Sequence, residues 1–191
     1  MTSRPLLLHT VALAIAGSLA FGTAALAAWK TEPGVPTPSY AVTQPEATTL
    51  NVDSLVLMCE PSGEPTPALQ LQLYLADDGP LLPRGAVAAA LKDEPRAELA
   101  IDGRVFPVEL YFADDHVVVA DVAQDPVPHL SGPLLDALQA GHRLVLHVDL
   151  LAEPAGQPAA FDGTLEVALA GPAIAAVRRC AGAPALSFAT H

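Results

Sequence analysis

The two cysteines of this chain, Cys59 and Cys180, are separated by more than half of its 191 residues. Cys59 ends the apolar run 54–59 (SLVLMC), which predicts a buried strand, and Cys180 ends the helix-like run 172–180 (PAIAAVRRC). A disulfide between them would join the first strand of a domain to its last helix. Closing so long a loop restricts the unfolded chain by roughly 4–5 kcal/mol. The alternative is a free buried thiol at each position.

Residues 1–27 have the layout of a secretory signal peptide: one basic residue, a long apolar stretch, and the small residues Ala25 and Ala27 at a cleavage site. Cleavage there gives a mature chain that begins at Ala28 and has no stable membrane insertion. An uncleaved anchor is the alternative, because the apolar stretch approaches spanning length. Export predicts a periplasmic or secreted protein and favours the disulfide, which persists outside the cytoplasm.

The chain is acidic, with 21 Asp and Glu against 9 Lys and Arg and a net charge of −12. Nucleic acids and anionic membrane surfaces both need positive patches, so this balance argues against either as a partner. It permits a basic partner. A solvated acidic surface that keeps the protein soluble is the simpler explanation.

The chain after residue 27 divides into three parts. Residues 28–50 contain four prolines and little periodicity, which predicts a flexible arm with the only tryptophan, Trp29, near its start. Trp29 either folds back onto the domain or is exposed. Residues 51–181 predict one β-rich globular domain of about 130 residues, a usual size for a single core. Residues 182–191 predict a flexible tail.

Alternation of apolar and polar residues marks the strands. In the run 69–75 leucines occupy every second position, and Gln70, Gln72 and Tyr74 fall on the other, solvent-facing side. The Asp-Gly pair at 102–103 lies between two strand-like runs, which predicts a hairpin with a type I′ turn. Pro107 limits the second of these runs to an edge or a bulge. Further strands are expected at 116–122, 143–151 and 165–169.

Two short helices are expected late in the chain. Ser131 is the N-cap of the first and Gly141 ends it, and 172–180 is the second. One or two helical turns are expected at 86–92, within a stretch, 80–96, that shows no clear pattern. The fold class is therefore mainly β, a single antiparallel sheet or sandwich-like domain with two short α-helices, closed by one disulfide.

Several features occur together: a tryptophan just after the signal, a strand ending in Cys59, the Asp-Gly hairpin, an LLDALQAG helix, an RLVLHV strand, and a closing LAGPAIAAVRRC helix that ends in Cys180. This layout resembles small periplasmic proteins of Gram-negative bacteria, of the type VI secretion-associated VasI/TagO-like or invasion-associated-locus-B-like kind. The resemblance covers roughly residues 55–181 and implies envelope residence and a non-enzymatic role. The chain departs from the pattern at FDGTLEVAL and in the proline-rich insertion 60–67.

Paired acids, Asp77-Asp78 and Asp114-Asp115, offer carboxylates that a hydrolase would use as acid and base. Adjacent Asp residues at strand ends are more often exposed turn formers. The group Asp114, Asp115 and His116 still defines the alternative function, a small secreted hydrolase or metal-binding protein.

His147 and Asp149 share one face of the 143–151 strand, a spacing at which a metal site can begin. The sequence has no His-x-x-x-His motif and no cysteine left over from the disulfide, so we expect a solvent-facing surface and no metal. It also has no G-x-S-x-G motif and no phosphate-binding glycine loop. We therefore predict no catalytic residue, no cofactor and no enzymatic activity.

The remaining prediction is that the protein acts by its surface. The exposed faces of the strands at 69–75 and 143–151, and the edge at Pro107, are suited to receive a partner strand or peptide. We predict an exported accessory or interaction domain of the cell envelope with an unidentified partner. Convergence of Asp114, Asp115, His116 and His147 in one concave pocket would favour the enzyme instead.

Overall fold

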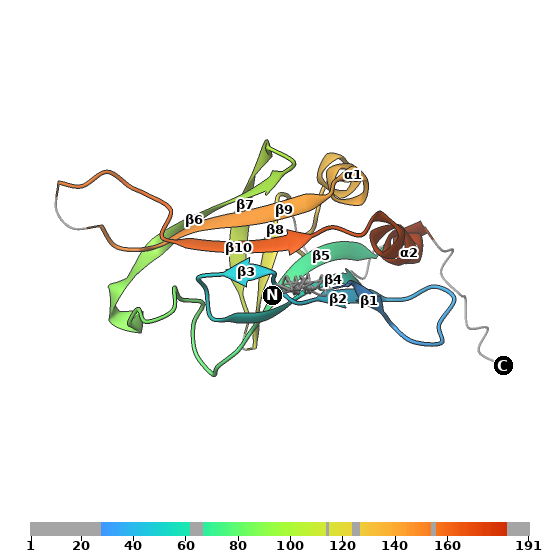
Figure 1. Ribbon diagram of the computed structural model, residues 1–191, viewed down its shortest axis with the longest axis horizontal. Coiled ribbons are helices and arrows are strands. Elements are labelled where there is room, and N and C mark those ends of the chain that lie inside the picture. Colours follow the sequence, from blue (N-terminus) through green and yellow to red (C-terminus); the bar gives the residue numbers. More distant parts are fainter. Residues whose placement is uncertain (1–27, 62–66, 114, 124–126, 154–155, 183–191) are drawn as a thin grey trace, which may run out of the picture.

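A computed structural model describes residues 28–61, 67–113, 115–123, 127–153 and 156–182 (Figure 1). The predicted signal peptide, 1–27, and all but the first residue of the predicted tail lie outside these ranges. The strands of the described chain are β1 (Lys30–Thr31), β2 (Tyr40–Thr43), β3 (Ala47–Thr48), β4 (Val52–Glu60), β5 (Ala68–Leu75), β6 (Leu91–Ile101), β7 (Arg104–Phe112), β8 (His116–Ala120), β9 (Arg143–Leu151) and β10 (Gly163–Ala168). The helices are η1 (Ala88–Ala90), α1 (Gly132–Ala140) and α2 (Gly171–Gly182).

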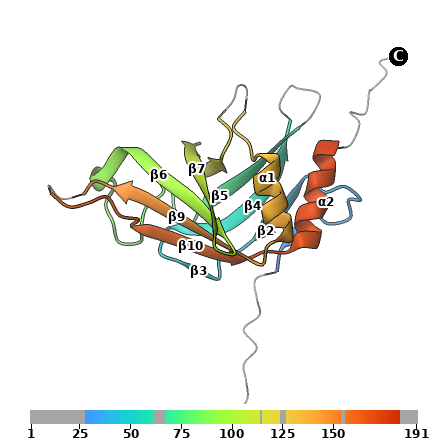
Figure 2. The ribbon, with the colours of Figure 1, turned by 90° about the horizontal axis from the view of Figure 1, so that it is seen from above.

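All ten strands belong to one antiparallel sheet, with the order β1-β2-β4-β5-β8-β7-β6-β9-β10-β3. The sheet curls into a half-barrel, and α1 and α2 lie side by side at one end of it (Figures 1 and 2). The fold class predicted from the sequence, mainly β with two short α-helices and one disulfide, is confirmed.

The inner face of the half-barrel forms the core. The leucines that alternate along β5 face inward, and Leu71 and Leu73 are at most 1% exposed. The alternating apolar residues of β9 do the same, from Leu144 to Leu150. Period-two placement of large apolar side chains thus fixes which face of each strand is buried.

The β6–β7 hairpin forms around the predicted turn. Asp102 and Gly103 have φ values of 47° and 86°, which is the pair of left-handed conformations that a type I′ turn requires. Pro107 is paired with Glu98 of β6 and precedes the pairing of β7 with β8, which begins at Glu109. Pro107 therefore lies at an edge, as expected, where its missing N–H removes no ladder hydrogen bond.

The two late helices close one end of the half-barrel. Ser131 caps α1 by accepting a hydrogen bond from the Leu134 N–H, as predicted. Ile174 and Val177 of α2 are at most 1% exposed. Cys59 at the end of β4 forms the predicted disulfide with Cys180 of α2, with their Cα atoms 6.4 Å apart.

The prediction that 28–50 is a flexible arm was wrong. The segment contributes β1 and β2 at one edge of the sheet and β3 at the opposite edge, so it connects the two edges. Its prolines all lie between these strands, where no ladder hydrogen bond is lost. Leu50 is fully buried and packs against Gly163, where a Cβ would meet Leu50 Cδ2 at 2.4 Å. Trp29 folds back, and its Nε1–H donates to the Ala168 carbonyl at 2.8 Å.

Two further expectations need correction. The helical turns expected at 86–92 shrink to the three residues of η1, and β6 begins at Leu91 because it pairs there with Leu151 of β9. The side of β5 expected to face solvent is also covered. Gln70 and Gln72 are 5% and 2% exposed and hydrogen-bond each other at 2.9 Å. Neighbouring strands on both sides bury this face, which periodicity along one strand cannot show.

Candidate functional site

β7 changes its partner strand halfway along its length. Its first half, as far as Val108, pairs with β6, and its second half, from Glu109 to Phe112, pairs with β8. β6 is irregular at the same end of the sheet, because the four residues between Leu91 and Arg96 lie opposite a single residue of β9. Since β6 follows β9 there while β7 follows β8, the two strands diverge. We call the space between 91–95 and 109–112 the β6–β7 notch.

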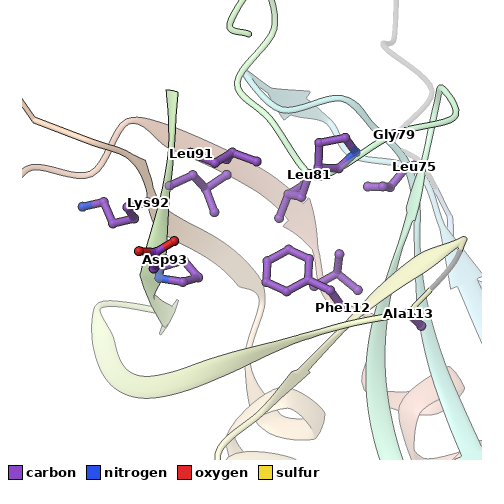
Figure 3. A pocket seen from close by; sticks show the side chains of 12 residues that line it. Leu75, Gly79, Leu81, Leu91, Lys92, Asp93, Phe112 and Ala113 are labelled. Carbon is purple, nitrogen blue, oxygen red and sulfur yellow. The ribbon is translucent and has the colours of Figure 1, made fainter. Parts of the chain in front are cut away.

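A pocket of about 450 Å³ lies on the inner side of the notch (Figure 3). Its walls come from both diverging strands, from β5, β8 and β9, and from the chain that leads from β5 to β6. The apolar part of the lining includes Leu75, Leu81, Leu91, Phe112, Val117 and Leu150. In Figure 3 the Phe112 ring points into the space between Leu81 and Leu91. It is nevertheless 55% exposed, so the pocket is open to solvent.

The backbone of β7 also faces the notch. The Ala113 N–H donates to the His116 carbonyl at 2.9 Å, so these residues form a hydrogen-bonded pair at the end of the β7–β8 ladder. In an antiparallel ladder such pairs alternate with non-hydrogen-bonded pairs. Leu110 and Phe112 therefore direct their N–H and C=O groups away from β8, into the notch. Among the described strands, none pairs with β7 on that side beyond Val108.

An ion-pair group borders the pocket. Asp149 of β9 is fully buried and accepts hydrogen bonds from Lys92 Nζ and, at 2.8 Å, from Arg96 Nε. Lys92 also donates to Glu153 at 2.9 Å. Burial by itself raises the pKa of Asp149, but the hydrogen bonds and charges of Lys92 and Arg96 outweigh it and lower that pKa below its usual value. The group holds the irregular part of β6 onto β9.

The residues expected to carry the alternative, catalytic function do not gather in the pocket. Asp115 contacts His116 Nδ1 at 2.7 Å at the start of β8, and the His116 ring stacks on Tyr74 with centroids 5.4 Å apart. His147 lies on β9, which β7 and β6 separate from β8, and its ring contacts that of Phe161. Asp114 lies outside the described residues.

The other polar candidates have structural partners. Asp77 and Asp78 are exposed in the bend that follows β5. Ser131 Oγ donates to Asp121 at 2.5 Å while it caps α1. In the part of the chain that the structure describes, no group of three or more His, Cys, Asp or Glu side chains is arranged to hold a metal ion.

Sequence reasoning missed the residues that build the notch. Phe112 continues the regular alternation of side chains along its strand, and Lys92 lies in an expected helical turn. Neither residue was therefore recognised as part of a site. The signal that was available is Pro95, which interrupts an otherwise strand-compatible run, together with Pro107 on the facing strand. A proline in a strand marks a place where ladder pairing is incomplete, and here each of the two facing strands has one.

Comparisons of the chain with models of protein families, with curated proteins and with solved structures found no match. Within the described ranges, no helix is both long and apolar enough to cross a membrane.

Proposed function

We propose that this chain is an exported, non-catalytic interaction domain of the cell envelope that binds an extended segment of a partner protein in the β6–β7 notch. The observation that carries this proposal is the change of partner along β7. It leaves the backbone groups of Leu110 and Phe112 directed into a space whose inner side is an apolar pocket. A strand edge beside a pocket is the arrangement used in β-strand addition.

Each part of the notch has a role in this mode of binding. The partner backbone adds to β7 along 109–112, and this pairing supplies hydrogen bonds that are independent of the partner's sequence. Alternate side chains of the added strand point to the inner face, where Phe112, Leu81 and Leu91 surround them. The pocket volume of about 450 Å³ accommodates one or two large apolar side chains. Specificity therefore lies in the apolar residues at every second position.

Export is supported by the disulfide and by the signal-like residues 1–27. A disulfide that joins β4 to α2 persists in the periplasm or outside the cell, whereas the cytoplasm keeps thiols reduced. The resemblance to small periplasmic proteins agrees with this location. The hydrolase alternative depended on His116 and His147 sharing a pocket, and they lie on separate strands.

The test is a selection of decapeptides from a random library on the folded, oxidised chain. We expect selected peptides to carry apolar residues at every second position and to protect the amides of Leu110 and Phe112 from hydrogen exchange. Methylating the peptide nitrogens that face β7 should abolish binding, and methylating the intervening ones should not. Phe112→Ser should weaken binding about tenfold, whereas Phe161→Ser, at another exposed phenylalanine, should not. Protection of other amides only, or equal binding by both variants, would refute the proposal.

A further inference from the structure

The three tyrosines of the chain lie on one outer face of the sheet. Tyr40 is paired with Met58, Tyr74 with Ser54, and Tyr111 with Val118. These positions alternate with inward-facing apolar residues of the same strands, such as Ala41 in β2 and Leu73 in β5, so all three side chains point away from the core. Aromatic residues make up only 5% of the sequence. Pairing nevertheless brings the tyrosines of β2, β5 and β7 together.

We call this surface the tyrosine face: Tyr40, Tyr74 and Tyr111 with Val42, Val56, Met58, Val118 and the buried Gln70 and Gln72 between them. Val56 and Val118 lie in the same cross-strand row as Tyr111, and each is 7% exposed. All three tyrosines are half-buried. Longer side chains therefore shield the shorter ones. A shallow hollow of about 330 Å³ lies among Tyr40, Met58 and Tyr74.

Carboxylates border the tyrosine face. The Tyr111 hydroxyl donates to Glu109 Oε2 at 2.6 Å. Asp115 bonds the His116 ring that stacks on Tyr74. The Tyr74 hydroxyl donates to Gln72 Oε1 at 3.3 Å, and Gln72 Nε2 donates to Glu60 Oε1 at 3.5 Å. Burial first, and then the negative charges of Asp115 and Glu60, raise the pKa of Tyr74.

Positive charge is scarce on the same surface. Among the described residues that are paired across this face, the one Lys or Arg is Lys30, which lies opposite Val42. The face therefore combines three aromatic rings and aliphatic side chains with an acidic border. Tyrosine rings attract cations over their faces, and carboxylates form charge-assisted hydrogen bonds with Arg and Lys.

We infer that the tyrosine face binds a basic segment of another protein, in which Arg or Lys alternates with apolar residues. The apolar residues contact Val42, Met58 and the tyrosine rings, and the cations reach Glu60, Glu109 and Asp115. A second copy of this chain fits poorly, because a symmetric interface would bring identical acidic borders together. This face is the opposite side of the sheet from the notch pocket, so the inference goes beyond the proposed function and does not depend on it.

The test uses a fluorescein-labelled dodecapeptide that alternates Leu and Arg, and a second one that alternates Leu and Glu. Anisotropy titrations at 50 mM and 300 mM salt measure both affinities. We expect the Arg peptide to bind, to weaken at high salt, and to bind at least tenfold more tightly than the Glu peptide. Equal affinity for the two peptides, or no binding of the Arg peptide, would overturn the inference.

Variants then locate the binding. Glu60→Gln with Glu109→Gln should weaken Arg-peptide binding about tenfold at 50 mM salt. Asp77→Asn with Asp78→Asn removes the same charge from an exposed bend and should leave affinity within twofold. Equal losses in the two double variants would mean attraction to net charge alone and would contradict a site on this face.

The aromatic contribution is tested at Tyr74. Tyr74→Phe should keep the affinity, because the ring remains, whereas Tyr74→Leu should weaken it about fivefold. Circular dichroism melting confirms that each variant is folded before its titration. Phe112→Ser should not change Arg-peptide binding, so failure of the notch proposal and failure of this one are distinguishable. An affinity unchanged by Tyr74→Leu would overturn the assignment to the tyrosine face.

Discussion

At one end of the half-barrel α1 and α2 cover the inner face of the sheet, whereas at the other end β6 and β7 diverge and leave the notch pocket open. The strands run between the two ends, so one strand contributes to both: β6 begins at the pocket with Leu91 and ends beside α1 with Ile101. At the helical end Ile174 and Val177 are at most 1% exposed. At the notch Phe112 is 55% exposed.

The contrast separates two uses of apolar surface. At the helical end it is removed from water when the chain folds, so it contributes to stability. At the notch the same inner face stays in contact with solvent, and under our proposal a bound segment of a partner would cover it. Exposed apolar surface beside free strand backbone is costly to leave open and is typical of interaction sites.

The largest expected effect is loss of the disulfide, which holds the helical end to β4. Cys59→Ser with Cys180→Ser should lower the free energy of unfolding by about 4 kcal/mol and the melting temperature by roughly 10 °C, because the unfolded chain regains a long loop. Calorimetry of the variant, beside wild type with and without reductant, measures this. If the variant has the same melting temperature as the oxidised wild type, then packing of the helices alone holds this end closed.

Truncation at the helical end should cost nearly as much. Ile174→Ala should destabilise the protein by about 3 kcal/mol, because it leaves a cavity under α2. Ala175→Gly in the same helix controls for helix propensity and should cost about 1 kcal/mol. Urea denaturation measures both changes, and equal losses would show that Ile174 does not pack as the structure describes.

The ion-pair group beside the notch should have an intermediate effect. Asp149→Asn removes the charge that Lys92 and Arg96 share and should cost about 2 kcal/mol, less than a fully buried pair because Arg96 is exposed. Asp93→Asn, at an exposed acid of the same strand as Lys92, is the matched control. A loss of stability no larger than that of the control would show that Asp149 does not hold β6 onto β9.

The pH dependence of this group has a defined sign. Asp149 has a lowered pKa in the folded chain, so its contribution is complete above the unfolded value of about 4 and is lost as pH falls through the folded pKa. Wild type should therefore lose stability below about pH 4, and Asp149→Asn should lose less. Denaturation midpoints between pH 2 and pH 7 test this, and parallel profiles for the two proteins would contradict it.

The smallest effect on stability is expected at the notch itself. Phe112→Ser should change the free energy of unfolding by less than about 0.5 kcal/mol, because the ring is largely exposed before and after unfolding. The same urea measurement used for Ile174→Ala compares the two ends directly. A loss at Phe112 similar to that at Ile174 would mean that the notch is part of the core, and the contrast between the ends would fail.

Local sequence signals predicted much of the helical end and the hairpin. The Ser131 cap, the Asp102-Gly103 turn and the alternating leucines of β5 and β9 each depend on contacts within a few residues, so they can be recognised without the fold. The Cys59–Cys180 pair was predictable because the chain has two cysteines. The notch was not predictable, because it depends on where β7 exchanges β6 for β8.

The sequence by itself determined which faces of the long strands are apolar, where the tight turn and the α1 cap lie, and which two residues form the disulfide. The tertiary structure alone decided the rest. It brought 28–50 into both edges of the sheet, although short proline-flanked strands have no stability of their own. It also gathered Tyr40, Tyr74 and Tyr111 on one face and opened the notch. Strand order is a long-range property, set by how all the apolar faces are buried together, and no single stretch of sequence contains it.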